Sequence, residues 1–208
     1  MHNLINFMFY FQVFFDGYSA GKCTATGSSE ECRGTGQIGN CNKKRINARP
    51  TNILPLSRGY LKLMSSDPLD HPLIYPHYLD KQKDVDILVD GLKLCIQLAN
   101  TPALQKYNYT IDKTPVTGCE SHEFASDEYF ECVIRRNTGA ENHQAGSCKM
   151  GPAEDPMAVV DNNLKVHGVK NVRVVDASFF PVNPNSNPTS VIIMAAEKIS
   201  DVIKEAWK

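Results

Sequence analysis

The stretch that decides how this chain is interpreted is Asn142-His143-Gln144-Ala145-Gly146-Ser147-Cys148-Lys149-Met150-Gly151. His143 carries an imidazole, a side chain that can be neutral near physiological pH and can then accept a proton. Gly146 and Gly151 follow it and allow another backbone to approach closely. The stretch therefore has the composition of a binding loop that contains one candidate base.

The chain beyond this loop ends in a predicted helix with a polar start. The helix runs from about Pro188 to Ala206, because its apolar residues recur at helical spacing. Asn187 is a good N-cap residue, and Pro188 suits the first helical position. The run Val172–Val175 is typical of a short apolar strand, and Asp176-Ala177-Ser178 follows it.

Two further helices are predicted in the middle of the chain. Apolar residues from Val85 to Ala99 follow the helical repeat and predict a helix over Asp84 to Asn100, which Asn100-Thr101-Pro102 ends. A second helix is predicted over Asp127 to Arg136, with Ser126 as its N-cap. Its acidic first turn and basic last turn both suit the helix dipole.

The first half of the chain predicts strands separated by a long loop. Phe7–Phe15 has high β-propensity and predicts a buried strand. The same stretch resembles the apolar part of a secretion signal, but no Lys or Arg precedes it, so we favour the strand. Residues 16–50 are rich in Gly, Ser, Thr, Cys and Asn and predict a loop. Gly59–Leu63 predicts a half-buried strand, and Leu73-Ile74-Tyr75 predicts another.

Composition narrows the possible partners. The net charge of −1 gives no electrostatic basis for binding nucleic acid or an anionic membrane. The apolar N-terminal stretch is too short to span a bilayer. The cysteines lack the paired spacing of zinc sites, so we predict no metal.

Seven cysteines and the sequon Asn108-Tyr109-Thr110 favour an oxidising compartment, and hence a secreted protein. Cys95 lies on a predicted apolar helix face and is expected to be reduced.

The order of these motifs resembles the C-terminal end of the glucose–methanol–choline (GMC) family of flavin oxidoreductases, and most of all its insect glucose dehydrogenase branch. The likeness runs from about Pro50 to the end of the chain. It rests on Pro55–Gly59, Ser66-Asp67-Pro68, Tyr75–Leu79, Thr114–Cys119, Asn142–Gly151, Val159-Val160-Asp161, Val166-His167-Gly168 and Val172–Ser178. Each motif is weak alone, whereas their combination is highly specific.

The resemblance implies an FAD cofactor and two catalytic residues. His143 would be the general base that takes the hydroxyl proton while hydride passes to flavin N5. Asn187 would hydrogen-bond the alcohol oxygen, with Asn183 and Asn185 as alternatives for that role. The expected flavin contacts are Asn142, Asp176, Ala177, Pro188 and Thr189. Without the resemblance, a lone histidine is more often structural, and Asn187 is more often only a helix cap.

The resemblance also implies an α+β fold. It predicts an antiparallel sheet with helices, which forms a substrate domain, plus the last strand and helix of an FAD-binding α/β domain. We expect three parts: residues 1–48 as a remnant with a long loop, 49–155 as the substrate-binding domain, and 156–208 as the closing segment of the FAD-binding domain. We expect no complete nucleotide-binding unit. The spacing Gly-x-Gly-x-x-Gly at Gly34–Gly39 lies inside the predicted loop, not between a predicted strand and helix.

The leading hypothesis is therefore a C-terminal fragment of an FAD-dependent dehydrogenase for a sugar or another small-molecule alcohol. A quinone or another electron acceptor would reoxidise it, and the 208 residues alone are expected to be inactive. One alternative keeps the fold but uses oxygen as the acceptor, as an alcohol oxidase. Another alternative, from a different class, is a non-catalytic secreted binding domain.

Overall fold

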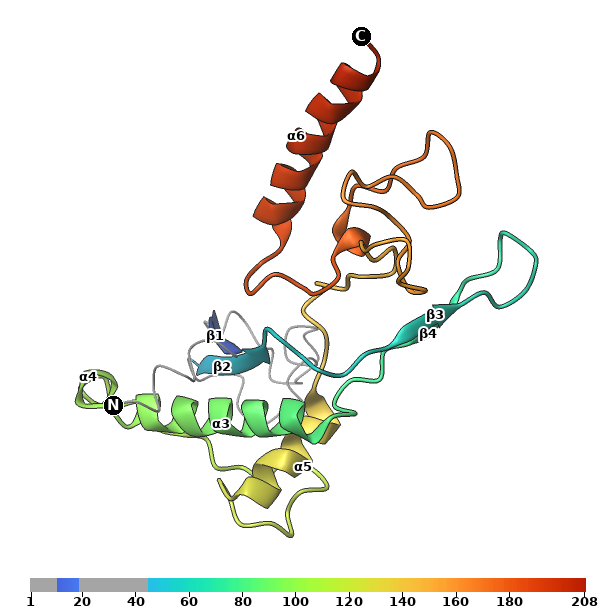
Figure 1. Ribbon diagram of the computed structural model, residues 1–208. Coiled ribbons are helices and arrows are strands. Elements are labelled where there is room, and N and C mark those ends of the chain that lie inside the picture. The colour runs from blue at the N-terminus through green and yellow to red at the C-terminus, as the bar shows by residue number, and fades with distance from the viewer. Residues whose placement is uncertain (1–10, 19–44) are drawn as a thin grey trace.

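The structure is a computed structural model that describes residues 11–18 and 45–208 (Figure 1). Helix α3 (Gln82–Ala99) lies at the centre of its first half. One face of α3 packs against α5 (Asp127–Asn137). The buried cluster between them joins Val85, Leu88 and Val89 to Tyr129, Phe130 and Ile134. Both helices were predicted, α3 from its apolar spacing and α5 from its cap and terminal charges. Ser126 caps α5 as predicted, because its side chain accepts a hydrogen bond from the Tyr129 N–H.

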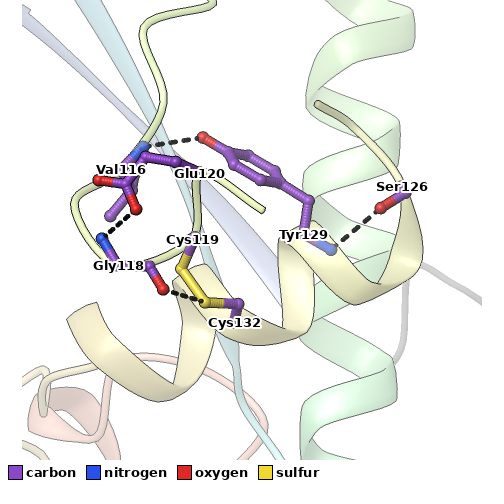
Figure 2. Close-up of a disulfide and its surroundings, with 7 residues drawn as sticks. All are labelled: Val116, Gly118, Cys119, Glu120, Ser126, Tyr129 and Cys132. Carbon is purple, nitrogen blue, oxygen red and sulfur yellow. Dashed lines mark hydrogen bonds between the residues drawn. A yellow bond between two sulfur atoms is a disulfide. The ribbon is translucent and has the colours of Figure 1, made fainter. Parts of the chain in front are cut away.

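A disulfide closes this first cluster. Cys119 is completely buried and bonds to Cys132 on α5, 13 residues later. Figure 2 shows the Tyr129 hydroxyl on the same side of α5, where it accepts a hydrogen bond from the Val116 N–H at 3.2 Å. The segment before α5 is thus held to the helix by a covalent bond and a hydrogen bond. Cys95 is a free thiol, as predicted, and burial raises its pKa.

We predict that replacing both disulfide cysteines by serine lowers the free energy of unfolding by about 3 kcal/mol, because the unfolded chain regains the entropy of a loop of this length. Urea unfolding of the chain measures the change. Cys148→Ser is the matched control, since Cys148 is a free cysteine. Equal unfolding midpoints for the double variant and the control would show that the bond contributes nothing to stability.

A two-stranded ribbon lies on the other side of α3. Strand β1 (Phe11–Tyr18) pairs antiparallel with β2 (Arg45–Asn52), with Phe11 opposite Asn52. A Cβ on Gly91 of α3 would lie 2.6 Å from the Pro50 Cβ, so this glycine lets β2 approach the helix. The predicted N-terminal strand is confirmed within Phe11–Phe15, although only Phe11 is fully buried. The predicted loop over residues 16–50 is wrong at both ends, because β1 and β2 extend into it.

The second ribbon is exposed rather than half-buried. Strand β3 (Tyr60–Lys62) pairs antiparallel with β4 (Leu73–Tyr75), as two of the predicted strands. Figure 1 shows this ribbon extending away from α3. Both strands are exposed throughout, and in the loop between them Leu63 and Leu69 keep 85% and 87% of their surface accessible. The alternating pattern predicted a buried face, but nothing among the described residues covers either face.

The C-terminal part has a separate buried cluster. Its members are Val160, Leu164, Phe179, Phe180, Ala195 and Ile199. The last two lie on α6 (Thr189–Ala206), which stands apart from α3 and α5 in Figure 1. None of the helices described in residues 11–18 and 45–208 is long and apolar enough to cross a membrane.

Two predictions for local structure in the C-terminal part are wrong, and one short helix elsewhere in the chain was not predicted. Val172–Val175 is not a strand: a strand needs a paired neighbour, and the described residues supply only an isolated antiparallel bridge between Lys165 and Arg173. Asn187 is not the N-cap of α6, because Pro188 holds that position and no side chain caps the helix. A short helix, α4 (Pro102–Gln105), follows the predicted end of α3.

Candidate active site

The His143 loop is bound along its length to the segment that begins at Asp176. The Gly146 N–H donates to the Ala177 oxygen at 3.4 Å, and the Cys148 N–H donates to the Ser178 oxygen at 2.9 Å. The Met150 N–H continues the series to the Phe179 oxygen at 2.8 Å. Two segments predicted to share a site are therefore adjacent, joined through backbone atoms that local sequence patterns do not reveal.

The surroundings of His143 place it at the margin of this pair of segments. Its side chain is half-buried, and Asn142 before it is exposed with a positive φ of 54°. Asparagine tolerates this left-handed conformation better than most residues. An asparagine at position 142 thus has a conformational reason besides the predicted flavin contact, because this residue makes the turn that leads into His143.

Asp176 caps the turn η2 (Ala177–Phe179). Its Oδ1 accepts hydrogen bonds from the Ser178 hydroxyl and from the Ser178 N–H, the latter at 2.8 Å. These two bonds, the hydroxyl first, hold the pKa of the exposed Asp176 carboxyl below its usual value. The carboxylate is therefore charged and oriented at neutral pH, with Ala177 next to it on the same turn.

The start of α6 is the third part of the candidate site. Pro188 is buried, while Asn187 and Thr189 are exposed. The first turn of α6 contains no acidic side chain. Its uncapped N–H groups and the positive end of the helix dipole are thus available to an anionic group. These features suit the role predicted for Pro188 and Thr189.

The structure links His143 to Asn183 rather than to Asn187. The Asn183 Nδ2 donates to the His143 main-chain oxygen at 2.9 Å. Within residues 11–18 and 45–208, no hydrogen bond joins His143 to Asn187. The pairing of His143 with Asn187 across a substrate therefore stays a prediction, whereas Asn183 has a direct contact that its position in the sequence only hinted at.

His167 contributes to the same region, which the sequence did not indicate. His167 is half-buried, and its Nε2 lies 3.0 Å from the Gly151 oxygen. The His167 N–H also donates to the Val159 oxygen at 2.9 Å. His167 thus binds the last residue of the His143 loop, Gly151, whereas Asn142 is the first residue of that loop.

Gly146 provides a sharp test of how tightly this loop is held. It has a positive φ of 89°, and a Cβ there would lie 3.2 Å from the Phe180 oxygen. We predict that Gly146→Ala costs about 1–2 kcal/mol of stability, since an L-residue is strained in this conformation. Chemical denaturation measures this cost. Gly139→Ala is the control, because nothing lies within 4 Å of its added methyl; an equal effect at the two sites would contradict the prediction.

Comparisons with known proteins agree on one family. The sequence model of GMC oxidoreductases matches residues 55–196. Glucose dehydrogenase [FAD, quinone] of Drosophila pseudoobscura pseudoobscura is 48% identical over 199 residues, which cover 94% of this chain and 30% of that protein. Mitochondrial choline dehydrogenase of Homo sapiens is 38% identical over 152 residues, covering 71% of this chain and 24% of the relative.

A solved structure gives the same picture of the fold. An FAD-dependent oxidoreductase from Chaetomium thermophilum superposes with a TM-score of 0.65 at 25% sequence identity, over 80% of this chain and 27% of that one. The chain thus spans less than a third of the length of these relatives. The resemblance inferred from the motifs is confirmed, and so is the α+β class. The chain belongs to the GMC oxidoreductase family.

Proposed function

We propose that this chain is the C-terminal part of an FAD-dependent oxidoreductase that acts on the CH–OH group of a sugar or another small alcohol. The observation that carries the proposal is the backbone series that binds the His143 loop to residues 177–179. It holds the loop that carries the candidate base against the turn that carries Ala177, one of the predicted flavin contacts. Family membership and the activities of the two dehydrogenase relatives support the reaction class.

The residues present fit a flavin in two respects. A reduced flavin is anionic, and an uncapped helix N-terminus without acidic neighbours stabilises such a charge. Ala177, next to the oriented Asp176, presents a small side chain beside which a planar ring can lie. When bound, FAD would supply the hydride acceptor. Thr189 and Pro188 would hold it from the helix, and Asp176, Ala177 and Asn142 from the loops.

His143 would act on the substrate itself. The half-buried imidazole would accept the hydroxyl proton of the alcohol as the C–H bond breaks. Asn187 is exposed at the start of α6, and its amide would orient the alcohol oxygen. The main chain that follows His143, fixed by backbone hydrogen bonds from Gly146 onward, would help to keep the imidazole in place through the proton transfer.

The experiment compares two proteins, the 208-residue chain and a longer protein that contains it. We expect the longer protein to be purified with flavin and to reduce a quinone dye when alcohol is added. The 208-residue chain should show neither property. Flavin and dye reduction in the short chain would overturn the proposal that the site is only partly encoded here, and a longer protein without flavin would overturn the function itself. Comparing oxygen with the quinone as acceptor separates a dehydrogenase from an oxidase.

We also propose an extracellular or otherwise oxidising location. The buried Cys119–Cys132 disulfide supports it, because such bonds persist in oxidising compartments. The sequon at Asn108 supports it as well, since all three of its residues are exposed. Mass spectrometry of protein purified from its natural source under non-reducing conditions tests this location. Free thiols at Cys119 and Cys132, with Asn108 unmodified, would contradict it.

A further inference from the structure

Among the residues that the structure describes, Asn183 is the one side chain whose hydrogen bond connects the His143 main chain to the segment leading into α6. This segment follows Phe180 and ends at Pro188, the residue before α6. Asn183 is half-buried, and its Nδ2 lies 2.9 Å from the His143 oxygen. The two residues are 40 positions apart in sequence. One hydrogen bond thus spans the two segments that carry His143 and Asn187.

Within residues 11–18 and 45–208, the other contacts that fix the main chain around His143 lie at a distance from the residue. On the N-terminal side, the Arg49 guanidinium pairs with Glu141 at 2.6 Å across an exposed surface, and an exposed ion pair contributes little. On the C-terminal side, the first backbone hydrogen bond in the series starts at Gly146. Asn183 is therefore the nearest restraint on His143, because it bonds to the residue itself.

We propose that Asn183 is a positioning residue for His143. By holding the His143 carbonyl, its amide fixes the peptide from which the imidazole projects, and ties that peptide to the chain entering α6. This inference rests on the proposed function, in which His143 is the base. Asn183 does not touch the reacting atoms and acts only through His143.

The hydrogen bond to the His143 oxygen requires a donor on the side chain at position 183, and the variants are chosen for this reason. Asn183→Asp keeps the size of the side chain but presents a carboxylate to a carbonyl oxygen, and so repels it. Asn183→Gln keeps an amide donor on a longer side chain. We expect Asn183→Asp to lower kcat about 10- to 100-fold with a smaller change in KM, because a displacement of the base of about 1 Å can cost this much. Asn183→Gln should recover part of the lost kcat.

The test uses the flavin-loaded longer protein and measures kcat, KM and flavin content. Asn162→Asp is the matched control, because it adds the same charge at an exposed position outside the candidate site. Should Asn183→Asp fail to retain flavin, Asn183→Ser, which is neutral and smaller, replaces it. A loss of kcat at position 183 alone, with flavin retained and partial recovery by Gln, supports the proposal.

Two other outcomes overturn it in different ways. If His143→Gln abolishes turnover but Asn183→Asp behaves like Asn162→Asp, the positioning role is wrong and the proposed function stands. If His143→Gln keeps full turnover, the base role of His143 fails, and the positioning role fails with it. The proposed function itself fails if the longer protein holds no flavin. An equal loss of kcat in the Asp and Gln variants also contradicts the proposal, because it shows that the amide donor is not what matters.

Discussion

Replacing His143 by glutamine is expected to lower the turnover of the flavin-loaded protein by about 10²- to 10⁴-fold, the usual contribution of a positioned general base. Glutamine has a similar size but cannot accept and carry the proton. Flavin content should stay unchanged, because the contacts expected for the flavin do not include the His143 side chain. Steady-state turnover with a quinone dye, together with the flavin absorbance of the purified protein, measures both effects.

The control for this prediction is another histidine. His122 is exposed and lies in a turn far along the chain from the site, so His122→Gln should leave turnover unchanged. Equal turnover in the His143 variant and the wild type would remove His143 from the chemistry. A loss of flavin together with turnover would mean that His143 supports the site rather than the reaction.

Asp84 is expected to have the second largest effect, on stability. It is only 2% exposed, at the start of α3, and it accepts bonds from the Leu56 N–H and the Ser57 N–H, both at 2.8 Å. The Ser57 hydroxyl and the Asn52 amide also donate to it. Because removal of the carboxylate leaves these donors without their partner, we predict that Asp84→Ala costs about 3 kcal/mol. Urea unfolding checks the value, with the exposed Asp86→Ala on the same helix as the control.

The same residue predicts a pH dependence. Burial alone raises the pKa of Asp84, but the hydrogen bonds from Ser57, Leu56 and Asn52 outweigh burial and hold the pKa below its ordinary value. A carboxyl with a lowered pKa in the folded state stabilises the fold above its unfolded pKa of about 4, and this contribution is lost as the pH falls toward the folded value. The stability difference between wild type and Asp84→Asn should therefore shrink below about pH 4. A difference that grows with acidity would contradict the direction of the shift.

The sequence predicted the parts of the fold that depend on local order. Helices α3 and α5 followed from apolar spacing and from the cap at Ser126, because these signals lie within one helix. Strand β2 was missed because its sequence is polar and contains Pro50, so it forms only by pairing with β1. Val172–Val175 was predicted as a strand on apolar character alone, without a partner to pair with. The pairing of Cys119 with Cys132 was likewise left open, because spacing does not determine it.

The candidate site shows the same difference between features that depend on local sequence and features that depend on the fold. Its members were predicted from recognisable motifs in loops and at a helix start, and their roles stay predictions. Their contacts were not predicted, because they depend on chain segments that meet only in the fold. Asn187 was chosen over Asn183 for its place before Pro188, yet the structure gives Asn183 the bond to His143. The division of the chain at residues 48/49 and 155/156 stays a prediction, and Met150 pairs with Val160 across the second boundary.

The most direct test of the central claim is the rate of flavin reduction by alcohol in the longer protein, followed by rapid mixing without oxygen. We predict that His143→Gln lowers this rate about 10²- to 10⁴-fold, the usual contribution of a positioned general base. Equal rates in the wild type and in the His143→Gln variant would show that another group takes the proton, and would contradict this claim.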